Sequence, residues 1–205
     1  VINGSYTIGG TLTLPSDPNR AGYTFNGWFL NSTGGTALVS PYSPPSTGTL
    51  TLYAQWTPIQ YTVTYNGNLS GGGTAPVNSA TYITGALIPV VGNTGGLTKA
   101  GYTFSDWTLN SQGTGTTYAA ASNYTVVTSN VTFYARWIAT PYSVTYNATS
   151  STGGSAPTDT STYTMGQNVP VLGNPGSLVR TGYTISGWTD NSGGSGTVYS
   201  SGNNY

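Results

Sequence analysis

Hydrophobic and polar residues alternate with a period of two in several short blocks of the chain. In YTVTYNG (residues 61–67), two tyrosines and Val63 fall on one face and two threonines on the other. LTLYAQW (50–56) and VTFYARW (131–137) alternate in the same way. This period is typical of a strand with one face packed and the other in water, as in antiparallel sheets. The pattern predicts a mostly β protein.

The blocks also recur along the chain. VTFYARW begins 81 residues after LTLYAQW (131 against 50), and YTVTYNG returns as YSVTYNA at 142–148, again 81 residues on. Self-similarity at a fixed period is the signature of a repeat architecture. We therefore expect three modules: 1–57, which lacks its first strand, 58–138, which is complete, and 139–205, which lacks its last strand.

One aromatic phrase occurs three times, as GYTFNGW (22–28), GYTFSDW (101–107) and GYTISGW (182–188). Strict alternation would bury Asp106 beside the aromatic residues, and a buried unpaired carboxylate is costly. A β-bulge at Asp106, and at the equivalent Gly27 and Gly187, would restore the parity. The predicted structural core signature is Tyr23, Phe25, Trp28, Trp56, Tyr102, Phe104, Trp107, Trp137, Tyr183, Ile185 and Trp188. The competing interpretation is a displayed aromatic site.

The segments between these blocks are rich in Gly, Ser and Thr and read as loops. Helix signal is poor, and the most the sequence allows is one helical turn in 117–124. The junctions TPIQ (57–60) and IATP (138–141) are short and carry a proline. They predict a semi-rigid, extended string of small domains.

The combined blocks resemble the Listeria–Bacteroides repeat, also called the internalin B-repeat. The resemblance covers essentially the whole chain, as one complete and two partial copies. Its basic position, before Gly-Tyr, is occupied by Arg20, Lys99 and Arg180. The resemblance implies tandem small β-grasp-like modules, used on bacterial surface proteins as stalk or adhesive spacer. In this sequence we expect little or no helix.

Charge is scarce. Only 4% of residues are charged and the net charge is zero, whereas soluble domains carry about 25%. The chain therefore offers no electrostatic surface for nucleic acid. No apolar run approaches the roughly 18 residues of a membrane span, so we expect no membrane insertion in this segment.

The sequence offers little material for chemistry. It contains no His and no Cys, and its four acidic residues are all Asp. General acid–base and nucleophilic catalysis require a titratable partner held close to the reacting group. We predict no enzyme activity, no catalytic residues, no cofactor and no metal site.

Two functions remain. The first is a structural tandem-repeat segment of an extracellular surface adhesin, stalk or filament. The second is a carbohydrate-binding module that stacks sugars on exposed Tyr or Trp, for example Tyr53 and Tyr134. Buried tryptophans in every module would favour the first, and a row of exposed tyrosines the second. Surface glycans are therefore a possible partner, and the expected location is extracellular or at the cell surface.

Aligning the repeats predicts open sheet edges in the first and last modules. Two explanations stay open. The chain is a window of a longer array, which we place first, or separate chains complete one another by strand exchange. The expected partners are accordingly neighbouring repeats or identical chains, bound by strand pairing.

Overall fold

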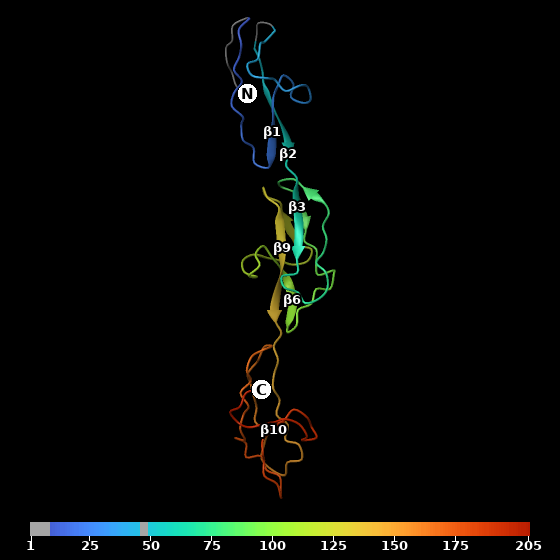
Figure 1. Ribbon diagram of the computed structural model, residues 1–205, viewed down its shortest axis with the longest axis vertical. Coiled ribbons are helices and arrows are strands. Elements are labelled where there is room, and N and C mark those ends of the chain that lie inside the picture. Colours follow the sequence, from blue (N-terminus) through green and yellow to red (C-terminus); the bar gives the residue numbers. More distant parts are fainter. Residues whose placement is uncertain (1–8, 46–48) are drawn as a thin grey trace. The chain divides into compact units, whose positions relative to one another are not determined.

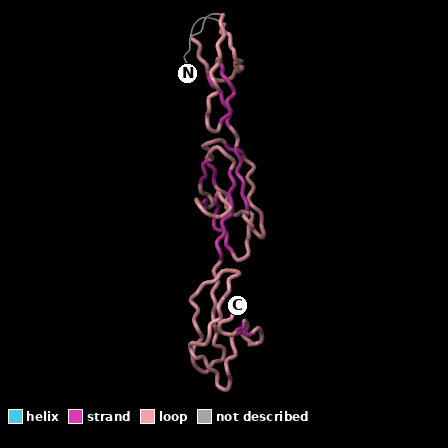
Figure 2. The backbone as a smooth tube through the Cα atoms, turned by 60° about the vertical axis from the view of Figure 1, so that its left-hand side comes forward, coloured by secondary structure: helices cyan, strands magenta, loops and turns pink. Residues whose placement is uncertain are grey.

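The computed structural model describes residues 9–45 and 49–205, and this part of the chain contains strands but no helix (Figures 1 and 2). The strands are β1 (Tyr23–Phe29), β2 (Tyr53–Pro58), β3 (Tyr61–Asn66), β4 (Thr81–Tyr82), β5 (Leu87–Pro89), β6 (Tyr102–Thr108), β7 (Thr117–Tyr118), β8 (Asn123–Thr125), β9 (Val131–Ala139), β10 (Trp188–Thr189) and β11 (Val198–Tyr199). The mostly-β prediction with little or no helix is confirmed. The helical turn allowed for 117–124 is wrong, because these residues form β7, a turn and the start of β8.

The chain divides into two compact units by its internal contacts. One comprises residues 1–97 and 105–136, and the other comprises 98–104 and 137–205. The first unit holds β1 to β5, β7 and β8, the second holds β10 and β11, and β6 and β9 contribute residues to both.

The first repeat contains an antiparallel pair, β1 with β2. Tyr23 lies opposite Pro58 and Phe29 opposite Tyr53, and the register shifts between Phe25 and Gly27. This shift is the predicted bulge. Gly27 has φ +120°, a value that residues with a side chain rarely adopt. The extra residue brings Phe25 within 5.6 Å of Trp28, measured between ring centres.

The second repeat builds a five-stranded sheet in the order β4-β3-β9-β6-β7, and β5 pairs with β8 separately. β3 and β9 run parallel, with Val63 opposite Val131 and Asn66 opposite Tyr134. Along β3 every second residue is buried and the intervening threonines are exposed. The alternation read from the sequence of β3 is thus confirmed.

Phe133, on β9, lies at the centre of the core of the second repeat and is 0% exposed. Its ring centre lies 5.3 to 5.4 Å from those of Tyr65, Tyr118 and Tyr124. These contacts join β3, the first strand of the repeat, to β7 and β8. Aromatic pairs at this spacing contribute about 0.5–1.5 kcal/mol beyond their burial.

The third repeat has less regular strand structure than its sequence predicts. YSVTYNA forms only an isolated bridge, between Tyr142 and Tyr163, and GYTISGW contributes only its last residue to β10. In the second repeat, β9 lies between β3 and β6. No described strand lies between the equivalent segments of the third repeat, so their backbones have no ladder to join.

Candidate functional site

The aromatic phrase of each repeat begins with the same tight turn. The amide of its tyrosine donates a hydrogen bond to the carbonyl three residues earlier, at 3.0 to 3.1 Å. The intervening glycine has φ between +72° and +78° in all three copies. A positive φ at the third residue is what a type II turn requires. The turns are Arg20–Tyr23, Lys99–Tyr102 and Arg180–Tyr183.

Each turn is braced by its own basic residue. The cation lies over the tyrosine ring at 3.7 Å for Arg20, 4.9 Å for Lys99 and 4.1 Å for Arg180, measured to the ring centre. Such cation–π contacts contribute about 0.5–1 kcal/mol at exposed sites. Three of the four basic residues of the chain therefore hold turns in shape.

The turn of one repeat also contacts the next repeat, in the same way at two places. The Ile59 amide donates to the Gly22 carbonyl, and the Thr140 amide donates to the Gly101 carbonyl, both at 2.9 Å. A Cβ on Gly22 would collide with the Thr84 hydroxyl, and one on Gly101 would lie 2.6 Å from Met165 Cβ. Thr84 and Met165 are equivalent positions of successive repeats. We call this recurring contact the joint.

The tryptophan of the phrase is fixed by a hydrogen bond at equivalent positions. The indole N–H of Trp28, Trp107 and Trp188 donates to the carbonyl of Pro15, Val91 and Leu172, at 3.0, 2.8 and 2.9 Å respectively. In the second repeat, the backbone amide of Val91 also donates to the Tyr65 hydroxyl at 2.9 Å. In the third repeat, the backbone amide of Leu172 donates to the Tyr146 hydroxyl at the same distance. The backbone N–H and C=O of one residue, Val91 or Leu172, thus orient both aromatic side chains.

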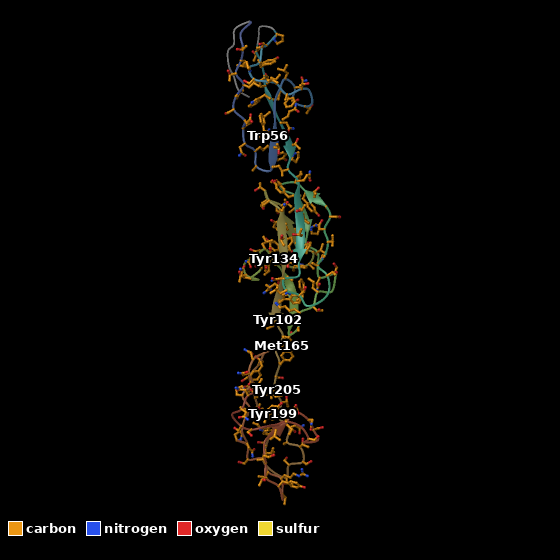
Figure 3. All side chains as sticks on the ribbon, viewed as in Figure 1. Trp56, Tyr102, Tyr134, Met165, Tyr199 and Tyr205 are labelled. Carbon is orange, nitrogen blue, oxygen red and sulfur yellow. The ribbon has the colours of Figure 1, made fainter. Side chains whose placement is uncertain are left out.

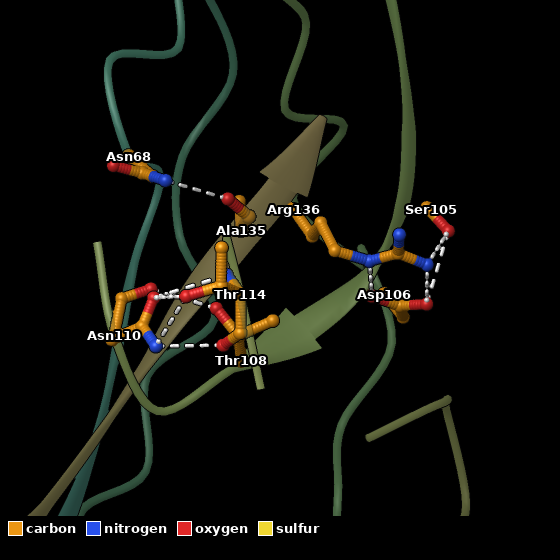
Figure 4. A network of polar contacts seen from close by, with 8 residues as sticks. All are labelled: Asn68, Ser105, Asp106, Thr108, Asn110, Thr114, Ala135 and Arg136. Atoms are coloured by element: carbon orange, nitrogen blue, oxygen red, sulfur yellow. Dashed lines mark hydrogen bonds and ion pairs between the residues drawn. The ribbon is translucent and has the colours of Figure 1, made fainter. Parts of the chain in front are cut away.

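Asp106 and Arg136 form a two-point ion pair between β6 and β9 (Figure 4). Arg136 Nε and a terminal nitrogen donate to the two carboxylate oxygens at 2.6 Å each, and Ser105 completes the network. The paired arginine satisfies the carboxylate that strict alternation would have left buried alone. The side chains are 13% and 30% exposed.

The hydrogen bond from Arg136 lowers the pKa of Asp106 below its ordinary value of 3.8, and Ser105 adds to this effect. In the first repeat the equivalent residues are Gly27 and Gln55, which lie opposite each other. There the Gln55 amide donates instead to the carbonyls of Asn31 and Gly34. The charged pair is therefore specific to the second repeat.

We predict that the contribution of Asp106 to stability depends on pH. A carboxyl whose folded-state pKa is lowered stabilises the fold above its unfolded pKa, and this effect is lost as the pH falls through the folded value. Asp106→Asn should lower the free energy of unfolding at pH 7 by about 1 kcal/mol. The difference from wild type should vanish in acid, below the lowered pKa. Urea titrations at pH 7 and at acidic pH measure it.

Asp17→Asn, in an exposed residue of the first repeat, is the control and should change little at either pH. A difference between Asp106→Asn and wild type that stays constant with pH would contradict the assignment.

The predicted core signature residues differ in burial. Trp28 and Trp107 are buried, at 8% and 0% exposed. Six are part-buried: Tyr23, Phe25, Trp56, Phe104, Trp137 and Trp188. Three are exposed: Tyr102 (40%), Tyr183 (67%) and Ile185 (49%). The two tyrosines lie under their turn cations rather than in the core. Ile185 lies in the third repeat, beside the position that β9 takes in the second.

Three tyrosines surround Phe133. The alternation in 61–67 placed Tyr65 on the same strand face as Val63, but Tyr118 and Tyr124 were not among the predicted core residues. Their signal was present, because Tyr65, Tyr118 and Tyr124 recur 81 residues later as Tyr146, Tyr199 and Tyr205. It was hidden because these residues come from separate loops and strands.

Across residues 9–45 and 49–205, no three His, Cys, Asp or Glu side chains gather as a metal ion would require. In that same part of the chain, no helix has the length and apolar character needed to cross a membrane.

The family model of the Listeria-Bacteroides repeat domain matches the chain three times, at residues 1–55, 61–136 and 142–205. The chain is also similar to an Evansella cellulosilytica protein named "Putative Gly-rich membrane protein", with 33% identity over 156 residues, covering 71% of this chain and 17% of that protein. It is 32% identical over 135 residues to Internalin H of Listeria monocytogenes, covering 65% of this chain and 23% of that protein. The chain thus spans less than a quarter of either relative. No solved structure matches it.

Proposed function

We propose that this chain, which belongs to the Listeria-Bacteroides repeat domain family, is a structural segment of a bacterial surface protein. It joins small domains in series and acts as a stalk, adhesive spacer or filament. Its working feature is the joint, rather than a pocket for a substrate.

The observation that carries this proposal is the repetition of the joint. The carbonyls of Gly22 and Gly101 accept the same hydrogen bond from the amide of the second residue of the following repeat. Both glycines leave no room for a side chain against that repeat. A flexible linker would not keep one contact at two places, since linkers rich in Gly and Ser behave as random coils. The joint is suited to hold neighbouring modules in a fixed orientation.

The modules of this array are 1–57, 58–138 and 139–205, each β-grasp-like but without the helix. The parallel pairing of the first and last strands of the second repeat, β3 and β9, supports this arrangement. The scarce charges support a structural role as well. Three basic residues stack on turn tyrosines and the fourth, Arg136, pairs with Asp106. All four therefore make contacts that stabilise the fold. We propose no catalytic role.

Rotational motion tests the joint. We expect the amides of the second and third repeats to share one correlation time in ¹⁵N relaxation measurements. Inserting a flexible Gly-Ser segment after Thr140 should give the two repeats separate, shorter correlation times. If the unmodified repeats already tumble independently, the spacer function is wrong.

The surface location has its own test. One relative is named as a membrane protein and another as an internalin, which supports display outside the cell. Protease treatment of intact cells that make the full-length protein should release peptides from residues 58–138 without lysis. Peptides that appear only after lysis, together with a cytoplasmic marker, would contradict this location.

Glycan binding is the second candidate function, because Tyr53 is 38% exposed. Its equivalent, Tyr134, which Figure 3 labels, is part-buried rather than exposed. A glycan array probed with the chain and with Tyr53→Ala separates the two functions. Binding that disappears in the variant would favour the carbohydrate module.

A further inference from the structure

The first and last strands of the second repeat are direct neighbours and run in the same direction. β3 and β9 are adjacent in the five-stranded sheet, with Val63 opposite Val131 and Asn66 opposite Tyr134. Figure 1 shows the two strands side by side. The chain between them, residues 67–130, holds all the other strands of this repeat. The second repeat therefore begins and ends in one pair of parallel strands.

This arrangement decides how the repeat is loaded when an array is stretched, because tension enters and leaves a module through its covalent backbone. It enters the second repeat at Tyr61, where β3 begins, and leaves at Ala139, where β9 ends. Since the strands are parallel, these two residues lie beyond opposite ends of the paired segment. Pulling them apart slides β3 along β9. The evenly spaced hydrogen bonds of a parallel ladder are then strained together, whereas antiparallel strands pulled at one shared end would separate one bond at a time.

Side-chain hydrogen bonds close the pair at both ends. At the start of β3, the Thr62 amide donates to the side-chain oxygen of Asn130 at 2.9 Å. Beyond the end of β3, the side-chain amide of Asn68 donates to the Ala135 carbonyl on β9, also at 2.9 Å (Figure 4). Both contacts join the two strands directly, so they resist the same sliding motion as the backbone ladder.

The two faces of the pair add further contacts. On the buried face, the rings of Tyr65 and Phe133 are stacked, with their centres 5.3 Å apart. On the opposite face, the hydroxyls of Thr64 and Thr132 form a hydrogen bond at 2.9 Å. Tyr65 and Phe133 are 8% and 0% exposed, so one side of the ladder is shielded from water. Hydrogen bonds are stronger where water does not compete for them.

We propose that β3 and β9 form a mechanical clamp, which keeps the second repeat folded when the array is stretched. The clamp comprises residues 62–68 and 130–135. While it holds, the glycine-rich loops between its two strands are under no tension, so they do not weaken the array. The inference rests on the proposed array function, because only a segment joined in series at both ends is stretched. It adds resistance to force, which the joint alone does not provide.

Pulling single molecules in two directions tests the clamp. The chain contains no Cys, so pairs of introduced cysteines, linked to DNA handles in optical tweezers, set where force acts on the full chain. Gln60→Cys with Ile138→Cys pulls the strands in shear, and Gln60→Cys with Ser129→Cys pulls both strands at one end. All three positions are exposed. The length released, about 3.6 Å for each residue between the handles, identifies the unfolding event.

At one pulling speed, we expect the shear pair to unfold at a force about three to five times higher, because four paired positions are loaded together rather than in turn. Equal unfolding forces in the two directions would overturn the proposal.

Two valine substitutions separate resistance to force from ordinary stability. Val63, in the clamp, and Val126, which follows β8, are 1% and 2% exposed. Val63→Ala and Val126→Ala should therefore shift the urea unfolding midpoint by similar amounts. Forced unfolding depends on the unfolding barrier, so we expect only Val63→Ala to lower the unfolding force in shear. An equal loss of force in both variants would show that the force reflects overall stability, and the clamp would be wrong. The two-direction test needs no core substitution and applies even if Val63→Ala does not fold.

The clamp and the spacer function can fail separately. Both cysteine pairs lie within the second repeat, so the hydrogen bond from Thr140 to Gly101 is outside the stretched segment. A low force in shear would overturn the clamp and leave the spacer function standing. Independent tumbling of the repeats would overturn the spacer function and leave the measured force unchanged.

Discussion

Replacing Trp107 with alanine is expected to lower the free energy of unfolding by about 3–5 kcal/mol. Trp107 is 0% exposed, and its ring centre lies 4.9 Å from that of Tyr65. Its indole N–H donates to the Val91 carbonyl at 2.8 Å. The truncation leaves a large cavity and also removes the donor from a buried carbonyl, which adds to the cost.

Trp188→Ala is the matched control. Trp188 keeps the same two contacts, to Tyr146 and to the Leu172 carbonyl, but its side chain is only part-buried. Its loss should be smaller, because solvent can fill the space left by the ring. Denaturant titrations of both variants measure the difference. An unfolding midpoint of Trp107→Ala close to wild type would show that the tryptophan is not a core residue.

The local features of the fold were predictable because they depend on local sequence. The alternation in β3 indicated which residues are buried, and the position of Gly27 indicated a bulge that the register of β1 and β2 confirms. The faces of β3 follow from the two-residue period of a strand, and the bulge at Gly27 follows from the backbone freedom of glycine. No knowledge of distant partners was needed.

Features that depend on distant partners were not predictable. The sequence indicated that Asp106 should not be buried alone, but its partner Arg136 lies 30 residues further along the chain. The third repeat has the same strand-forming pattern as the second, yet 143–147 is not a strand, because pairing requires a neighbour in space. The exposure of Tyr183 was missed for a similar reason. Its ring packs on Arg180 and not on the core that its spacing suggested.

Replacing Gly101 with alanine should lower the free energy of unfolding more than the same change at Gly182. The two glycines occupy equivalent turns of the second and third repeats, with φ +72° for Gly101 and +78° for Gly182. The strain of placing a side chain at positive φ, about 1–3 kcal/mol, is therefore common to both. A Cβ on Gly101 would also lie 2.6 Å from Met165 Cβ and 2.9 Å from its sulfur, whereas a Cβ on Gly182 would meet no atom within 4 Å.

The difference between the two variants therefore measures the joint. We expect Gly101→Ala to be destabilised by a further 1–3 kcal/mol or so, the usual cost of overpacking a contact, or to separate the rotational correlation times of the second and third repeats. Gly22→Ala should behave like Gly101→Ala, since its Cβ would collide with Thr84. Met165→Ala should relieve part of the defect of Gly101→Ala, because it removes the sulfur that the new methyl group meets. Gly101→Ala and Gly182→Ala could instead lower the free energy of unfolding equally and leave the rotational correlation times of the repeats unchanged. Gly101 would then be required only by its turn, and the joint would not hold the repeats together.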